Sequence, residues 1–189
     1  FLLQAANRDK MARFTISVSK LLVEFLQRSQ SGRKDTIAQL NAVAGALATT
    51  RSSFLWLREV FFIVQLSKLP PLQSFASYCS AISKLCLMAF VTLRNIEWLI
   101  TVRILNGDKP SIIKLAFKFY ALSWLCELLP RLKAMSSKKP TSSEALLSLR
   151  DAALVVEGLG YSGLKQVDPA VLSLIGMLTS GYELYLSWV

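Results

Sequence analysis

Residues 11–28 read MARFTISVSKLLVEFLQR, and the spacing within this stretch decides the fold class. Apolar residues recur at steps of three and four along one stripe, and polar residues recur at the same steps along another. The apolar stripe is Met11, Phe14, Val18, Leu21 and Phe25, and the polar stripe is Arg13, Ser17, Lys20, Glu24 and Gln27. This period is typical of an amphipathic α-helix. We predict a helix over residues 2–30 that ends at Ser31-Gly32.

The same helical period continues through the rest of the chain, and no strand-like alternation of useful length occurs. Further helices are predicted at residues 36–69, 72–105, 111–132, 143–157 and 169–189. The predicted fold is all-α: a membrane-associated bundle of five or six helices, with long amphipathic helices and a C-terminal transmembrane helix. A polar loop at 134–143 separates an N-terminal part, 1–133, from a C-terminal helical hairpin, 144–189.

The composition favours contact with a lipid surface. Of the 189 residues, 53 % are hydrophobic and 18 % are charged, which excludes intrinsic disorder. Lys and Arg number 22 against 12 Asp and Glu, so the net charge is +10, and the basic residues lie singly along apolar segments. Such a chain suits anionic lipids better than nucleic acid, whose binding proteins cluster their charge on a polar face. We predict membrane lipids as partners and no nucleic acid.

Catalytic and metal chemistry has little support in the sequence. The chain contains no histidine, which excludes Ser-His-Asp and Cys-His systems and histidine metal ligands. Cys79, Cys86 and Cys126 form no C-x-x-C pair, and the carboxylates are scattered singly. The stretch GLGYSG at 158–163 follows a helix rather than a strand, so we interpret it as a helix stop and hinge and not as a nucleotide loop. We predict a non-enzymatic protein without catalytic, cofactor-binding or metal-binding residues.

The best candidate to cross a membrane is the last predicted helix. Residues 169–189 contain Glu183 as their only charged residue, and at 1.5 Å per residue they would span about 30 Å. Residues 81–105 are the second candidate. Uncharged runs stay shorter than the roughly 18 residues of a clear span, so a soluble bundle is the alternative. The small residues Gly176, Ser180 and Gly181 are expected to pack closely against another helix.

Residues 54–68 combine bulky apolar and basic side chains, as does a helix that lies in a membrane interface. The candidates for insertion among the acyl chains are Phe54, Leu57, Phe61 and Val64. The candidates for contact with lipid headgroups are Arg51, Arg58 and Lys68. An ordinary bundle helix with a buried apolar face is the other interpretation of the same stretch.

Four segments, collinear over nearly the whole chain, resemble the motifs of one family. Asn7-Arg8-Asp9-Lys10 is similar to a Gly-Arg-Asp-Lys-type box, with Asn in place of Gly, and Arg94-Asn95-Ile96-Glu97-Trp98-Leu99 is similar to a segment that ends a third helix. Lys118-Phe119-Tyr120-Ala121-Leu122-Ser123-Trp124 is similar to an Arg-Phe-x-x-Phe-Trp-like run, and residues 176–188, GMLTSGYELYLSW, to a closing Gly-x-x-x-Ser-Ser helix with a Trp. Together these segments resemble the peroxin-11 family.

The resemblance implies a protein of the peroxisomal or glycosomal membrane that elongates the organelle before it divides. Residues 1–133 would remodel the membrane, and the implied partners are a second copy of the chain, the import receptor for peroxisomal membrane proteins and the dynamin-type fission machinery. The family's amphipathic helix often carries Arg-Leu-Gly-Lys, where this chain has Leu55-Trp56-Leu57-Arg58. We therefore expect this helix to depend more on apolar insertion and less on charge.

Two other classes of function remain open at this stage. A pore-like role in the passage of small metabolites has been proposed for the family, and here the path would be lined by basic residues of the central helices. These residues are Lys84, Arg94, Arg103, Lys114 and Lys118. The second alternative is a soluble helical adaptor, which alkali would extract from membranes.

Overall fold

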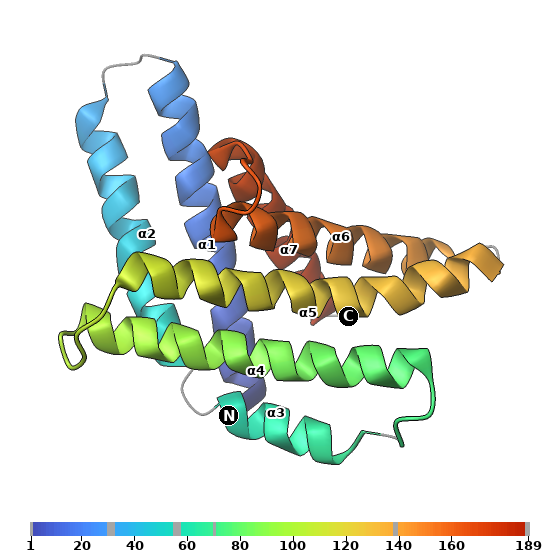
Figure 1. Cartoon of the computed structure of the whole chain (residues 1–189). Coiled ribbons are helices and arrows are strands. Elements are labelled where there is room, and N and C mark those ends of the chain that lie inside the picture. Colours follow the sequence, from blue (N-terminus) through green and yellow to red (C-terminus); the bar gives the residue numbers. More distant parts are fainter. Residues whose placement is uncertain (1, 30–32, 55–57, 70, 138–139, 188–189) are drawn as a thin grey trace. The chain divides into compact units, whose positions relative to one another are not determined.

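The structure, a computed structural model, describes residues 2–29, 33–54, 58–69, 71–137 and 140–187, with the side chains of 2–6, 53 and 54 outside the description. The described residues form seven helices and no strand (Figure 1). They are α1 (Leu2–Arg28), α2 (Lys34–Phe54), α3 (Arg58–Ser67), α4 (Phe75–Thr101), α5 (Lys109–Ser137), α6 (Ser142–Ser162) and α7 (Pro169–Leu186). The predicted all-α class is confirmed, and the predicted count of five or six helices is wrong by one.

The additional helix comes from the stretch 36–69, which was expected to be a single element. α2 ends at Phe54 and α3 begins at Arg58, while residues 55–57 lie outside the described part of the chain. α2 packs against α1, whereas α3 packs against α4. Because each helix buries its own face against its own partner, the apolar spacing of residues 40–64 does not belong to one stripe.

The chain forms two compact units, one of residues 1–54 with 166–189 and one of residues 55–165. In the first unit α1 packs against α2 and against α7. In the second unit α4 packs against α3 and α5, and α5 packs against α6 (Figure 1). The predicted polar loop at 134–143 lies inside the second unit, where α5 continues to Ser137 and α6 begins at Ser142. The two helices of the predicted C-terminal hairpin belong to different units, α6 to the second and α7 to the first.

The core of the second unit is built from all four of its helices. Its buried members are Phe62 of α3, Phe90 and Val91 of α4, Ala116 and Tyr120 of α5, and Leu154 of α6. The rings of Phe90 and Tyr120 lie 5.0 Å apart between centroids, within the range of favourable aromatic pairs. Burial of these large side chains supplies the main stabilisation of the unit.

Glycines at 158–163 have two separate roles. α6 continues through Gly158 and Gly160, and Gly163, with φ of 75°, is its left-handed C-cap. At Gly158 an added Cβ would lie 2.9 Å from the backbone N and Cα of Ala121, so only glycine permits this approach of α5 to α6. The predicted helix stop is therefore correct at Gly163 and wrong at Gly158, whose glycine serves close packing.

Asp168 begins α7 and ties it to α1. Its carboxylate accepts the backbone N–H of Ala170 at 2.8 Å, and Nη2 of Arg28 lies 2.6 and 2.7 Å from its two oxygens. The hydrogen bond from Ala170, followed by the one from Arg28, lowers the pKa of Asp168 below its ordinary value. Pro169 follows in the first turn, so the start of this helix predicted from Asp168-Pro169 is confirmed.

By length and composition, one helix among the described residues could cross a membrane, and it is α4. Its 27 residues measure about 40 Å, more than the roughly 30 Å hydrocarbon core. α7, the helix expected to span, has 18 residues, or about 27 Å, and buries Ser173, Thr179 and Ser180. The best candidate is therefore α4, which overlaps the second prediction, 81–105, over residues 81–101. A core helix of a soluble protein passes the same test, and α4 packs against α3 and α5.

Candidate membrane-contacting site

One exposed apolar surface of the second unit is the outward face of α3, formed by Val60, Phe61, Ile63 and Val64. These four large apolar side chains are between 43 % and 55 % exposed. Val60 and Val64 lie one turn apart, with Ile63 and Phe61 on either side of them. A contiguous exposed apolar surface of this kind marks a site of interaction with a partner or a membrane.

The opposite side of α3 packs against the rest of the second unit. Phe62 is 6 % exposed and joins the core. Oε1 of Glu59 accepts a hydrogen bond from Nδ2 of Asn95 at 2.7 Å and a longer one from Oγ1 of Thr92 at 3.4 Å. A surface helix normally buries its apolar side and exposes its polar side. In α3 the carboxylate contacts the protein and four large apolar residues face outward, an arrangement suited to an apolar environment outside.

Of the predicted inserting residues, two lie on this surface. Phe61 and Val64 are on the outward face, Leu57 lies outside the described residues, and the side chain of Phe54 is not described. Val60 and Ile63 are exposed as much as these two and were not predicted. The predicted spacing assumes one continuous helix, whereas α3 is a separate helix whose faces do not continue those of α2. The unbroken apolar run 60–64 was the signal that could have found them.

The three predicted headgroup-facing cations have different surroundings. Nε of Arg51, on α2, forms an ion pair of 2.6 Å with Oδ1 of Asp9, whose carboxylate is buried. Arg58 is half-buried at the start of α3, and Lys68 is exposed just after the helix ends. The Asn7–Lys10 box thus provides a carboxylate that holds α2 to α1, a role that the sequence did not indicate.

The predicted packing residues lie on the side of α7 that meets α1. Gly176 and Ser180 are buried, and a Cβ at Gly181 would lie 3.4 Å from Cε2 of Phe14. Polar contacts complete this seam: Nζ of Lys10 donates to the carbonyl of Glu183 at 3.3 Å. Small residues on α7 and long basic residues on α1 therefore share the interface.

The five residues proposed to line a pore have different surroundings. Nζ of Lys84 donates to Oγ of Ser80 at 2.7 Å, and the predicted Arg94–Glu97 pair is present at 3.0 Å. The remaining three, Arg103, Lys114 and Lys118, are exposed.

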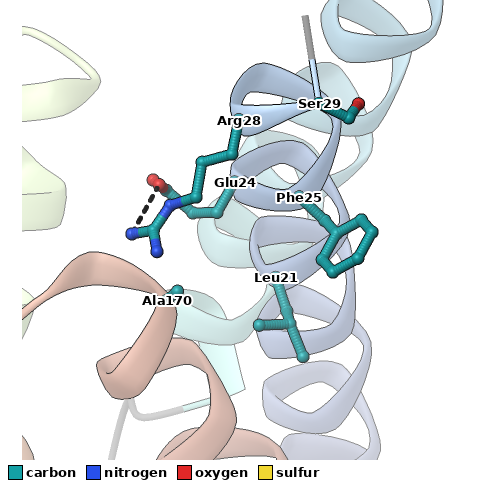
Figure 2. A pocket seen from close by; sticks show the side chains of 6 residues that line it. All are labelled: Leu21, Glu24, Phe25, Arg28, Ser29 and Ala170. Carbon is teal, nitrogen blue, oxygen red and sulfur yellow. Dashed lines mark ion pairs between the residues drawn. The ribbon is translucent and has the colours of Figure 1, made fainter. Parts of the chain in front are cut away.

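A cavity of about 340 Å³ lies in the first unit. Figure 2 shows the side chains that line it, with the Glu24–Arg28 ion pair of α1 among them. Its lining residues are Leu21, Glu24, Phe25, Arg28, Ser29 and Ala170. None of the five cations belongs to this lining, so the pore function stays a prediction.

The described residues contain no group of three or more His, Cys, Asp or Glu side chains that could hold a metal ion. Cys79, Cys86 and Cys126 are free, buried thiols. Burial raises the pKa of the Cys126 thiol, which disfavours its reactive thiolate form.

Comparison with known proteins assigns the family. Neither the search of curated proteins nor the search of solved structures gave a match. The family model described as Peroxisomal biogenesis factor 11 (PEX11) matches residues 1–146, which include α1 to α5, the start of α6 and three of the four motif segments; residues 176–188 lie beyond the match. The match covers well over half of the 189 residues. The chain therefore belongs to the Peroxisomal biogenesis factor 11 (PEX11) family.

Proposed function

We propose that this peroxisome biogenesis factor elongates the peroxisomal membrane by inserting the outward face of α3 into one leaflet. The observation that carries the proposal is the exposure of Val60, Phe61, Ile63 and Val64 on a helix whose other side is docked in the core. Side chains that enter one leaflet expand its area relative to the other, and the membrane bends. The net charge of +10 complements an anionic surface.

The energy available from one copy is modest. Complete burial of a large apolar side chain contributes about 1.5–3 kcal/mol, and about half of each of these four remains exposed, so insertion contributes about 3–6 kcal/mol. A free energy of this size alone corresponds to roughly millimolar binding. We therefore propose that self-association and attraction between basic residues and anionic headgroups raise the affinity, and that several copies act on the same patch of membrane.

The test uses the full chain with vesicles of phosphatidylcholine and phosphatidylserine, measuring bound protein by co-sedimentation and tubules by electron microscopy. Phe61→Glu and Val64→Glu each place a charge on the outward face, and we expect about tenfold weaker binding and loss of tubules. Gln65→Glu is the matched control, because it adds the same charge to the same helix at a position that is already polar. Normal tubulation by both outward-face variants would contradict the proposal.

The proposed protein partners follow from the family. They are further copies of the chain, the import receptor for peroxisomal membrane proteins and the dynamin-type fission machinery. Cross-linking of the vesicle-bound chain tests the first of these, and we expect dimers or larger species that do not form in dilute detergent. Resistance to alkaline extraction from isolated peroxisomes tests the proposed membrane insertion against the soluble-adaptor alternative.

A further inference from the structure

Glu59 is the single acidic residue in the sequence of α3, and its half-buried side chain contacts α4. Its Oε1 accepts from Nδ2 of Asn95 at 2.7 Å. Asn95 is buried, and its Oδ1 has no hydrogen-bond partner among the described residues. An unsatisfied buried acceptor is costly. The amide of Asn95 nevertheless suits this position, because its Nδ2 donates to the carboxylate of Glu59, which can only accept.

The two docking contacts of α3 differ in what they fix. Phe62 contacts the core through apolar packing, which has little directional preference. The hydrogen bond of Glu59 requires a defined distance and angle. Glu59 and Phe62 are three residues apart and share one side of the helix, whereas Val60 and Val64 point away from that side. Together the two contacts determine the rotation of α3 about its own axis.

We propose that Glu59 is a positioning residue that clamps α3 to α4, so that the outward face meets the bilayer as a wedge fixed to a folded body. The inference rests on the proposed function. A released α3 can turn and bury Phe62 in lipid together with Phe61, which favours binding. Such a helix is no longer coupled to the body of the protein, so bending of the membrane is lost although binding is kept.

The experiment uses the full chain on phosphatidylcholine–phosphatidylserine vesicles, with tubules counted at equal amounts of bound protein. Asn95→Asp sets a carboxylate against that of Glu59 and should release the clamp. The double variant E59Q/N95D restores a donor and an acceptor, now in reverse order. Glu59→Gln alone keeps an acceptor for Asn95 and serves as the conservative control. Circular dichroism selects preparations of equal helix content.

For N95D we expect unchanged or tighter binding to vesicles, about tenfold fewer tubules, and faster amide exchange across residues 58–67. The size follows from the hydrogen bond to a charged group, whose loss shifts the equilibrium between docked and released α3 by about tenfold or more. E59Q/N95D should recover both tubules and protection, and E59Q should resemble the wild type. Wild-type tubulation by N95D, or a double variant that regains protection without regaining tubules, would overturn the clamp. Failure of the proposed function differs from both outcomes, because V64E would then bind and tubulate normally.

Discussion

Asp151 provides the sharpest test of how the second unit is stabilised. Its carboxylate, on α6, is fully buried. Oδ2 lies 2.9 Å from Nε of Arg131 on α5, and Oδ1 lies 2.6 Å from Nη2 of Arg150. The guanidinium of Arg150 also lies over the ring of Trp124, 5.2 Å from its centroid. One buried anion therefore holds two cations at the α5–α6 interface.

Asp151→Asn keeps the volume of this side chain and removes its charge. Removing one partner of a buried pair costs about 3–5 kcal/mol. Arg131 and Arg150 keep 34 % and 16 % of their side chains exposed, so both recover some hydration, and the asparagine oxygen still accepts one hydrogen bond. We therefore expect a loss of about 2–3 kcal/mol in the free energy of unfolding.

Arg131→Met is the matched comparison. It leaves Asp151 paired with Arg150, and it removes the more exposed of the two cations. We expect a loss of about 1 kcal/mol, so the aspartate variant should be clearly the less stable of the two.

The assay is denaturant unfolding of the full chain in zwitterionic detergent micelles, followed by circular dichroism and by tryptophan fluorescence, since Trp124 lies next to Arg150. High salt should change the loss in Asp151→Asn little, because a buried pair is poorly screened. A loss below about 1 kcal/mol, or an equal loss in Arg131→Met, would refute the reasoning, because the carboxylate would then not be the centre of the cluster.

Two further predictions concern helix contacts. Gly158→Ala should destabilise the chain, because the new Cβ would lie 2.9 Å from backbone atoms of Ala121. At Gly45 an added Cβ meets nothing within 4 Å, so Gly45→Ala should stabilise the chain by about 0.5–1 kcal/mol. Unfolding in micelles measures both changes. Folding lowers the pKa of Asp168 below its ordinary value of 3.8. The ionised carboxylate therefore stabilises the fold fully above pH 3.8, and this stabilisation is lost as the pH falls from there through the pKa of the folded state. The melting temperature of Asp168→Asn, which keeps a capping side chain, should therefore fall less in acid than that of the wild type; equal acid slopes would contradict the assignment.

Periodicity predicted most of the helices, because a helix that buries one face repeats its apolar residues every three or four positions. α1 ends within two residues of its predicted limit, and α7 begins at Pro169 as expected from the Asp168 cap. The predicted end of α5, at 132, is too early, because the polar stretch 134–143 was interpreted as a loop. The helix passes through Pro130 and continues to Ser137. Local composition indicated where helices occur more reliably than where they stop.

The candidate site could be predicted only in part, since its key contacts join distant residues. Phe61 and Val64 were recognised from their apolar character. The Glu59–Asn95 hydrogen bond spans 36 residues and the Arg51–Asp9 contact spans 42, and no local pattern encodes either. Which side of α3 faces outward depends on the contact with Asn95, so the sequence predicted Phe61 and Val64 on that face but not Val60 and Ile63.

The pairing of α1 with α7 has a consequence for biosynthesis. The second unit, residues 55–165, is continuous in sequence, whereas the first requires residues from both sides of it. Domains fold as units while the chain is being made, from the N-terminus onward. The second unit can therefore fold as it leaves the ribosome, while α1 and α2 wait for α7 to be translated. During that interval the seam side of α1, with Lys10 and Arg13, is exposed, and the contacts with Glu183 and Thr179 cover it only later.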